Sequence, residues 1–324
     1  MRTRDIVVVG ASAGGVNALQ AFAGSLPPDL PAAIFVVLHL PAHYPSSLAA
    51  ILTRSGPLPA TNAVDGEPIE PGRIYIAIPN FHLLVGNEFL SVARGPKVNR
   101  ARPAIDLLFQ SAAGSYGPRV VGVVLSGMLD DGTRGLASVK RRGGYVIVQD
   151  PDEALYASMP RSAAENVSVD RILPVAEIGP VLRQLATEPL KGDALMYERA
   201  SSNGGSSLDN TGDMTREISP FTCPDCGGTL WEMEEGSVAH YQCRVGHAFS
   251  PSHLLASQVD QVEALLWASL RAMEERESIY RMILNRAGEH GAVVVQSSIE
   301  SKIETNSRHA RLLRQILLDE DASP

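Results

Sequence analysis

A serine between small residues follows the first apolar run of the chain, at residues 6–9. The spacing Gly10-x-Ser12-x-Gly14 is that of a nucleophile elbow, in which small neighbours let the backbone bend tightly and present a serine oxygen. Backbone N–H groups at the start of a following helix would face the negative charge that develops beside that oxygen. The segment therefore indicates nucleophilic catalysis, with a phosphate-binding turn or a plain strand-to-helix connection as the alternatives.

A dinucleotide-binding turn fits this segment less well. That motif requires G-x-G-x-x-G and an acidic residue about twenty positions later. Here Ser12 stands in place of the second glycine, and Asp29, the next acidic residue after Asp5, lies in a proline-rich turn. We therefore expect no nucleotide cofactor for the chemistry of this turn.

A histidine and two aspartates occupy comparable positions after later apolar runs. His39 ends the run 33–39, and Asp130 and Asp131 follow the run 120–125. In open parallel sheets the active site lies at the carboxyl ends of the strands, and a histidine held by a carboxylate activates a serine. These positions predict a hydrolase that uses Asp131, with Asp130 as a solvated neighbour. A strand-capping histidine and a helix-capping Asp131 are the structural alternatives.

Short β-branched runs alternate with helical segments in the first half of the chain. This pattern predicts an α/β fold, a doubly wound and mostly parallel sheet with helices on both faces. The order Ser, His, Asp along the chain differs from that of α/β-hydrolases. Residues 72–94 indicate an antiparallel excursion with a turn at 86–88. The expected strands are 6–9, 33–39, 74–78, 120–125 and 146–149, and the expected helices are 16–24, 48–54, 104–113, 133–142 and 160–166.

Composition and charge exclude several classes of protein. The 324 residues are 44% hydrophobic, enough for a large core, and carry a net charge of −8 without a block of Lys and Arg. Nucleic acid is therefore not expected as a partner. No apolar run approaches the roughly 18 residues that would span a bilayer, and the first strand leaves no room for a signal peptide. We expect a soluble, cytoplasmic protein with no membrane insertion.

All three cysteines lie close together in the second half of the chain, which excludes a disulfide scaffold. Cys223-x2-Cys226 is followed by Cys243-x3-His247, a spacing typical of a tetrahedral zinc site. Four protein ligands leave no open position, so the metal is expected to be structural. A redox Cys-x2-Cys pair is the alternative. His240 is expected to be exposed rather than a further ligand.

The segments around this cluster predict the organisation of the second half. Residues 189–219 are polar and rich in Gly and Ser, typical of a flexible linker. A zinc ribbon is expected over 220–250, with short strands at 229–233 and 239–242. Apolar residues at helical spacing over 254–287 and 292–318, with a break at 288–291, predict a helical hairpin within 251–324. Such a hairpin is either a docking or self-association module or a completion of the ribbon's core.

Several stretches resemble the chemotaxis protein-glutamate methylesterases, the CheB catalytic-domain family. They follow one another in the family's order over most of the first domain, 1–188, which makes the match more specific than any single motif. Ala13, Leu38 and Leu129 depart from the family's frequent residues. The matching stretches are Val9-Gly10-Ala11-Ser12-Ala13-Gly14-Gly15, Leu38-His39-Leu40-Pro41, Tyr75-Ile76-Ala77, Asn99 to Phe109, Ser126-Gly127-Met128-Leu129-Asp130-Asp131-Gly132, Gln149-Asp150-Pro151 and Met159-Pro160-Arg161.

The resemblance implies a doubly wound fold and a triad of Ser12, His39 and Asp131. Ser12 would attack the side-chain carbonyl of a methylated glutamate, and methanol would leave before water cleaves the acyl-enzyme. Deamidation of a receptor glutamine is implied by the same route. The expected oxyanion donors are the backbone N–H groups of Ala13, Gly14 and Met128.

The resemblance also implies a partner, a methylated chemoreceptor-type protein. Arg102 and Arg161 are candidates for steering an acidic receptor helix, although a surface arginine is more often a solvated ion-pair partner. Many family members carry a receiver domain before the catalytic strand, and we expect none here, so that the C-terminal module would take its regulatory place. The rival functions are a non-catalytic signalling scaffold and an esterase for small molecules.

Overall fold

The computed structural model describes residues 2–40, 46–190, 216–235, 238–289 and 293–320. The chain divides into two compact units, Met1–Leu254 and Leu255–Pro324. None of the helices in the described ranges is long and apolar enough to cross a membrane.

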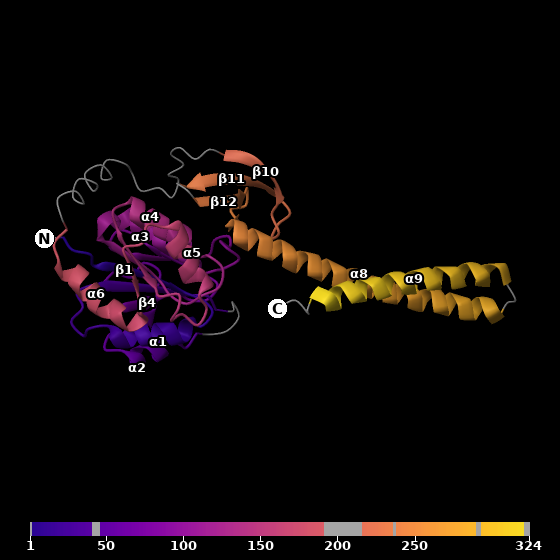
Figure 1. Cartoon of the computed structure of the whole chain (residues 1–324), viewed down its shortest axis with the longest axis horizontal. Helices are drawn as coiled ribbons and strands as arrows, with labels where there is room; N and C mark the ends of the chain where they lie inside the picture. The colour runs from indigo at the N-terminus through magenta and orange to yellow at the C-terminus, as the bar shows by residue number, and fades with distance from the viewer. Residues whose placement is uncertain (1, 41–45, 191–215, 236–237, 290–292, 321–324) are drawn as a thin grey trace. The chain divides into compact units, whose positions relative to one another are not determined.

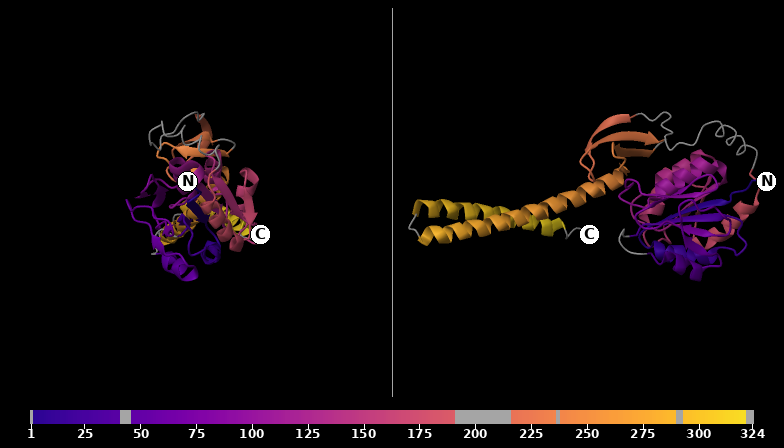
Figure 2. Two further views of the ribbon diagram at one scale, coloured as in Figure 1. Left: turned by 90° about the vertical axis from the view of Figure 1, so that its left-hand side faces the viewer. Right: turned by 180° about the vertical axis from the view of Figure 1, so that it is seen from behind.

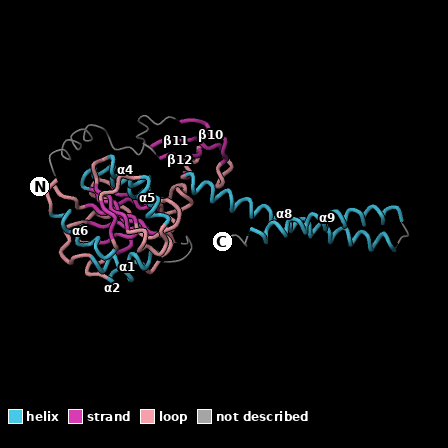
Figure 3. Tube along the Cα trace, in the orientation of Figure 1, coloured by secondary structure: helices cyan, strands magenta, loops and turns pink. Residues whose placement is uncertain are grey.

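A sheet of seven parallel strands forms the centre of the first unit (Figures 1 and 3). Its strand order is β3-β4-β2-β1-β7-β8-β9, so β1 lies between β2 and β7. The chain builds outward from β1 in both directions, and the carboxyl end of β1 is therefore the switch point at which α/β sheets bind ligands. The strands are β1 (Ile6–Ala11), β2 (Ala33–Leu38), β3 (Ala60–Asn62), β4 (Ile74–Ile76), β7 (Val120–Val124), β8 (Tyr145–Gln149) and β9 (Arg171–Leu173).

Helices cover both faces of this sheet, which confirms the predicted fold class. Successive residues of a strand point to opposite faces, and both faces are buried here. Val7 and Val9 enter one core, whereas Ile6 and Val8 enter the other. This explains why β1 is apolar throughout. One face carries α1 (Gly15–Ser25), α2 (Leu48–Ser55) and α6 (Val175–Thr187), and the other carries α3 (Ile105–Tyr116), α4 (Thr133–Arg141) and α5 (Ser158–Asn166), with a short 3-10 turn, η1 (Gly117–Arg119), after α3.

One part of the predicted antiparallel excursion is wrong. Its first segment, β4, pairs in parallel with β2 and β3 and belongs to the central sheet. Only β5 (His82–Val85) and β6 (Leu90–Ala93) form an antiparallel hairpin. All three residues of β4 are buried, which a strand needs when both of its faces are covered. The edge strands β3 and β9 have three residues each, too few for a periodic signal in the sequence.

Four antiparallel strands form the ribbon, which belongs to the first compact unit. Its small core contains Cys223, Leu230, Cys243, Phe249 and Leu254. The first strand begins inside the segment predicted as linker, whereas residues 191–215 lie outside the described ranges. The strands, in spatial order, are β10 (Arg216–Thr222), β11 (Thr229–Glu235), β12 (Val238–Cys243) and β13 (Ala248–Phe249).

The predicted pair of C-terminal helices is present as α8 (Pro251–Glu289) and α9 (Val293–Glu320). In the second unit they run antiparallel and side by side (Figures 1 and 2). Leu270, Ala310 and Leu317 form the buried contact between them. The Asn306 amide donates to the Met273 carbonyl at 2.7 Å. The helix α8 ends at Glu289, inside the predicted break at 288–291, and residues 290–292 lie outside the described ranges.

Candidate active site

Ser12, His39 and Asp131 form one chain of hydrogen bonds at the switch point of the sheet. Ser12 directly follows β1, His39 directly follows β2, and Asp131 lies in the loop after β7. The His39 Nδ1 atom lies 3.2 Å from Ser12 Oγ, and its Nε2 atom lies 2.9 Å from Asp131 Oδ2. The parallel register of the three neighbouring strands brings these ends together.

The partners of His39 define the tautomer of its ring. An ionised carboxylate can only accept hydrogen bonds, so Nε2 carries the proton that Asp131 accepts. The lone pair of Nδ1 is therefore directed toward the Ser12 hydroxyl. His39 can then remove the serine proton, and Asp131 can stabilise the imidazolium that results.

Asp131 is kept ionised by the donors around it. Its side chain is fully buried, and the carboxylate accepts from His39, from Asn99 Nδ2 at 2.8 Å and from the Ile105 N–H at 2.7 Å. Burial alone would raise the pKa of Asp131, but the hydrogen bond and charge of His39 and the Asn99 amide lower that pKa well below its usual range. The Ile105 N–H opens α3, and a helix N-terminus favours negative charge.

The turn after β1 presents Ser12 and leaves backbone donors beside it. The Ser12 N–H donates to the Ser126 carbonyl at 3.0 Å. Gly14 has φ of 69°, and a Cβ there would lie 2.8 Å from Ser126 Oγ, so glycine is required for both reasons. Among the described residues, no hydrogen-bond partner is found for the N–H groups of Ala13, Gly14 and Met128. These are the three groups predicted to bind an oxyanion.

The two predicted steering arginines lie in different environments. The Arg102 Nε atom donates to Asn80 Oδ1 at 3.0 Å, and its guanidinium also binds the Gly95 carbonyl. Arg102 therefore joins two loops and is only partly exposed. Arg161 is exposed on α5.

A second carboxylate, missed in the sequence, lies next to Asp131. Asp106 is 2% exposed and accepts the N–H groups of Gly132 at 3.0 Å and Gly135 at 2.7 Å. Burial and the charge of Asp131 raise the pKa of Asp106 to about 7. Asp106 thus supports the loop that carries Asp131. It lies in one of the stretches that resemble the family, but no local pattern marks a contact between residues 25 positions apart.

Asp130 is not the solvated residue that the sequence predicted. Its side chain is 15% exposed and accepts hydrogen bonds from Ser250 Oγ and His253 Nδ1, each at 2.7 Å. Burial would raise the pKa of Asp130, but the hydrogen bond and charge of His253 and the Ser250 hydroxyl lower it. The end of the ribbon, through Ser250, and the start of α8, through His253, therefore contact the neighbour of Asp131.

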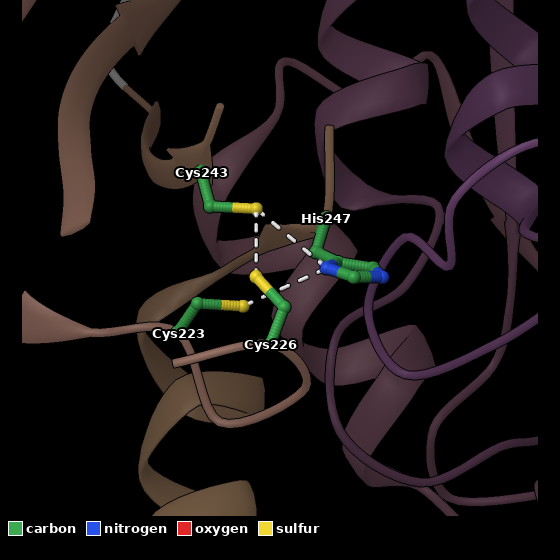
Figure 4. Close-up of side chains that lie close together, drawn as sticks. All are labelled: Cys223, Cys226, Cys243 and His247. Carbon is green, nitrogen blue, oxygen red and sulfur yellow. Dashed lines mark hydrogen bonds between the residues drawn. The ribbon is translucent and has the colours of Figure 1, made fainter. Parts of the chain in front are cut away.

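The four predicted metal ligands come together in the ribbon (Figure 4). Their ligand atoms all lie within 4.8 Å of one another. The sulfurs of Cys226 and Cys243 are 3.6 Å apart, and His247 Nδ1 lies 3.7 Å from Cys223 Sγ. A tetrahedral ion with metal–sulfur bonds of about 2.3 Å needs sulfurs about 3.8 Å apart. The cluster could therefore hold a metal ion.

His240 is buried, not exposed as predicted, and it stands outside the metal cluster. It is 5% exposed, and its Nδ1 atom has no hydrogen-bond partner in the described part of the chain. Burial, followed by the charge of Arg134 on α4, lowers the pKa of His240 from an ordinary 6.5 to about 3. The folded ribbon therefore excludes the proton that His240 binds when the chain is unfolded.

The stability of the ribbon is expected to decrease in acid because of His240. Below about pH 6.5 His240 binds a proton in the unfolded chain but not in the folded chain. The free energy of unfolding therefore decreases as the pH falls toward 3, by about 2 kcal/mol at pH 5. His240→Gln removes this loss. Urea unfolding at pH 7 and pH 5, followed by Trp231 fluorescence in a Trp267→Phe background, measures it. His309→Gln, on the exposed surface of α9, is the control, and equal pH dependence in all three chains would contradict the account.

Comparison with known proteins places this arrangement in a family. The family model described as CheB methylesterase matches residues 7–182, more than half of the chain. The "Protein-glutamate methylesterase/protein-glutamine glutaminase 2" of Anaeromyxobacter dehalogenans is 41% identical over 181 residues, which are 56% of this chain and 53% of that relative. A relative from Leptospira interrogans is 37% identical over 182 residues, 56% of this chain and 94% of its own length.

A solved structure agrees with these relatives. The CheB methylesterase catalytic domain of Thermotoga maritima is 38% identical, with a TM-score of 0.54, and the match covers 56% of this chain and 98% of that domain. The chain spans about half the length of the relatives from Anaeromyxobacter dehalogenans and Ralstonia nicotianae. The matched residues contain all three members of the hydrogen-bonded chain, and the ribbon lies beyond them. The chain belongs to the CheB methylesterase family.

Proposed function

We propose that this chain is a serine hydrolase that removes the methyl group from glutamate γ-methyl esters on chemoreceptor-type proteins. The observation that carries the proposal is the hydrogen-bonded chain from Ser12 through His39 to the buried Asp131. A nucleophile, a base and an orienting carboxylate in contact are what acyl transfer needs. The names of the relatives supply the substrate class, a methylated protein glutamate.

In the first step, Ser12 forms an ester with the receptor side chain. Its hydroxyl proton passes to His39 Nδ1 while Oγ attacks the carbonyl carbon. The N–H groups of Ala13, Gly14 and Met128 stabilise the oxyanion, each by about 3–4 kcal/mol. The intermediate collapses, the C–O bond to the methoxy group breaks, and that group takes the proton from His39 and leaves as methanol.

In the second step, water replaces methanol. His39 removes a proton from water, whose oxygen attacks the acyl carbon. The bond between that carbon and Ser12 Oγ breaks, Oγ takes the proton from His39, and the glutamate side chain is released. A glutamine amide that enters the same site would release ammonia in the first step, so deamidation requires no further group. Neither step requires a cofactor.

We assign catalysis to residues 1–188 and separate functions to the rest. The segment predicted as linker serves as one up to the start of β10 at Arg216, the strands from there to residue 250 as a zinc ribbon, and 251–324 as a helical hairpin for docking or self-association. Arg161, exposed on α5, is the better placed of the two candidates for guiding an acidic receptor helix, because Arg102 already binds Asn80.

The rival functions differ in what they hydrolyse. An esterase for small molecules would cleave p-nitrophenyl acetate with a higher kcat/KM than a methylated receptor, and a scaffold would cleave neither. We expect the methylated receptor to be the better substrate, and to inhibit cleavage of p-nitrophenyl acetate competitively. A receptor that binds without inhibiting would contradict a shared site.

We further propose that the cysteine cluster holds a structural zinc ion. Thiolates and a histidine nitrogen are preferred zinc ligands, and the distances between them fit a tetrahedral ion. Four protein ligands leave no position for substrate, so the ion would stabilise the ribbon rather than take part in hydrolysis. Burial raises the pKa of the Cys223 thiol to about 12, and coordination would be what deprotonates it.

Metal analysis of the purified chain is expected to find one zinc per chain. Cys226→Ser should lose at least about nine-tenths of it, because three ligands bind zinc far more weakly than four. His240→Gln is the matched control, since His240 lies outside the cluster, and it should retain the metal. Thiols that react freely with a disulfide reagent without releasing any metal would contradict the assignment.

A further inference from the structure

The ribbon pairs with the loop that precedes α3. Asn99 lies in this loop with φ of 50° and is 4% exposed. Its backbone N–H donates to the Ala248 carbonyl at 2.8 Å, and the Ala248 N–H donates to the Lys97 carbonyl at 3.3 Å. Val98, Ala104 and Ala248 form one buried apolar cluster. The strand β13 therefore continues main-chain pairing from the ribbon onto this loop, within the first compact unit.

The side-chain amide of Asn99 links the ribbon to both buried carboxylates. Its Nδ2 group donates to Asp131 Oδ1 at 2.8 Å and to Asp106 Oδ2 at 2.9 Å. Its Oδ1 atom accepts the backbone N–H of Ser250 at 2.9 Å. An N–H group can bond only to the oxygen of the amide, so Ser250 favours the orientation in which both amide hydrogens face the carboxylates.

This orientation matters for the direction in which Asp131 points. Asp131 Oδ1 is occupied by Asn99, while Oδ2 faces His39. Asp106 lies on the other side of the same amide, and two buried carboxylates repel each other unless a donor lies between them. Without Asn99, Oδ1 would keep only the long hydrogen bond from the Asp106 N–H at 3.3 Å, so the Asp131 carboxylate would be held less firmly toward His39. The ribbon also contacts this region through Asp130, which accepts from Ser250 Oγ.

We propose that Asn99 is a positioning residue through which the seated ribbon holds Asp131 in line with His39, so that Ser12 is fully reactive only while the ribbon contacts this loop. The inference rests on the proposed function. The family match ends at residue 182, so Ser250 comes from a part of the chain outside it. Hydrolysis by residues 1–188 thus depends on a module that supplies no reacting group.

Two substitutions of Asn99 in the full-length chain test this inference. Asn99→Gly removes the amide and tolerates the positive φ. Asn99→Asp keeps the shape of the side chain and an acceptor for the Ser250 N–H. It replaces the NH2 group with an oxygen, so that a third carboxylate faces those of Asp106 and Asp131. The rate at which a fluorophosphonate probe labels Ser12 measures its nucleophilicity without the receptor. We expect this rate and the kcat for methylated receptor to fall at least about tenfold, with KM within about twofold.

A pair of substitutions at Ser250 tests the ribbon side. Ser250→Pro removes the N–H that binds Asn99, and the extended conformation of Phe249 before it suits a following proline. Ser250→Ala keeps this N–H and loses only the hydroxyl bonds to Asp130 and His253. We expect Ser250→Pro to lower the labelling rate at least about tenfold and Ser250→Ala to lower it less than about threefold.

Thermal unfolding of each variant verifies that the chain is folded. Wild-type labelling rates in Asn99→Gly and Asn99→Asp would overturn the inference, as would equal rates in folded Ser250→Pro and Ser250→Ala. If Ser250→Pro does not fold, the two Asn99 variants decide the question. A wild-type chain that the probe does not label at Ser12 would instead overturn the proposed function, a result distinct from either of these.

Discussion

Ser12→Ala is expected to lower the kcat for methylated receptor at least about ten-thousandfold, because it removes the atom that forms the acyl-enzyme. The backbone donors and the substrate contacts would remain, so KM should change little. The substitution removes one half-buried oxygen, and the fold should be retained. Methanol release under saturating receptor is the measurement.

The matched control for this variant is Ser168→Ala. Ser168 is exposed in the loop after α5, so its loss should leave kcat within about twofold. Residual turnover in Ser12→Ala above about a hundredth of the wild-type rate would mean that another group attacks the ester. His39 would then be a general base for water, and the two-step mechanism would be wrong.

Asp131→Asn is expected to lower kcat by about three to four orders of magnitude. An asparagine can satisfy His39 Nε2 only with its oxygen, which turns its NH2 group toward Asn99 Nδ2 and the Asp106 N–H, both donors. The opposite orientation makes Nε2 the acceptor and moves the ring proton to Nδ1, which then cannot accept the proton of Ser12. The first orientation leaves donors facing donors and no negative charge to stabilise the imidazolium, and the second removes the base, so the rate of Ser12 labelling by the fluorophosphonate probe should fall with kcat.

Asp152→Asn is the control for the loss of a carboxylate, since Asp152 is exposed after β8. It should leave the labelling rate unchanged. Asp131→Asn with a labelling rate close to that of wild type would contradict the role of Asp131 in orienting His39. It would leave Asp131 as a support for α3 alone.

The central part of the fold was predictable from local patterns in the sequence, namely apolar runs and the polar residues that directly follow them. Continuous apolar runs such as 6–9 and 120–125 indicate strands buried on both faces, and both are strands of the central sheet. Since the carboxyl ends of parallel strands meet, the placement of Ser12 and His39 after such runs was enough to predict their contact. The edge strands β3 and β9 were missed because three residues show no period.

The surroundings of the triad were not predictable in the same way. Asn99 and Ser250 contact each other across 151 positions, and no local pattern relates them. Asp130 was expected to be a solvated neighbour of Asp131, yet Ser250 and His253 cover it. His240 was expected on the surface, yet it is buried and near enough to Arg134 for the charge of that residue to lower its pKa. In each case the contact forms only because the ribbon and the residues after it pack on the first domain.

Methanol released from a methylated receptor by the intact chain would show whether Ser12 acts as an esterase nucleophile. We expect saturable release, with one methanol for each methyl ester lost and one new glutamate carboxylate at the same position. Ser12→Ala, measured in parallel, should release methanol no faster than spontaneous hydrolysis of the ester in buffer. A receptor that binds the intact chain but keeps all its methyl groups would contradict the account, and would favour a scaffold that retains the triad without using it.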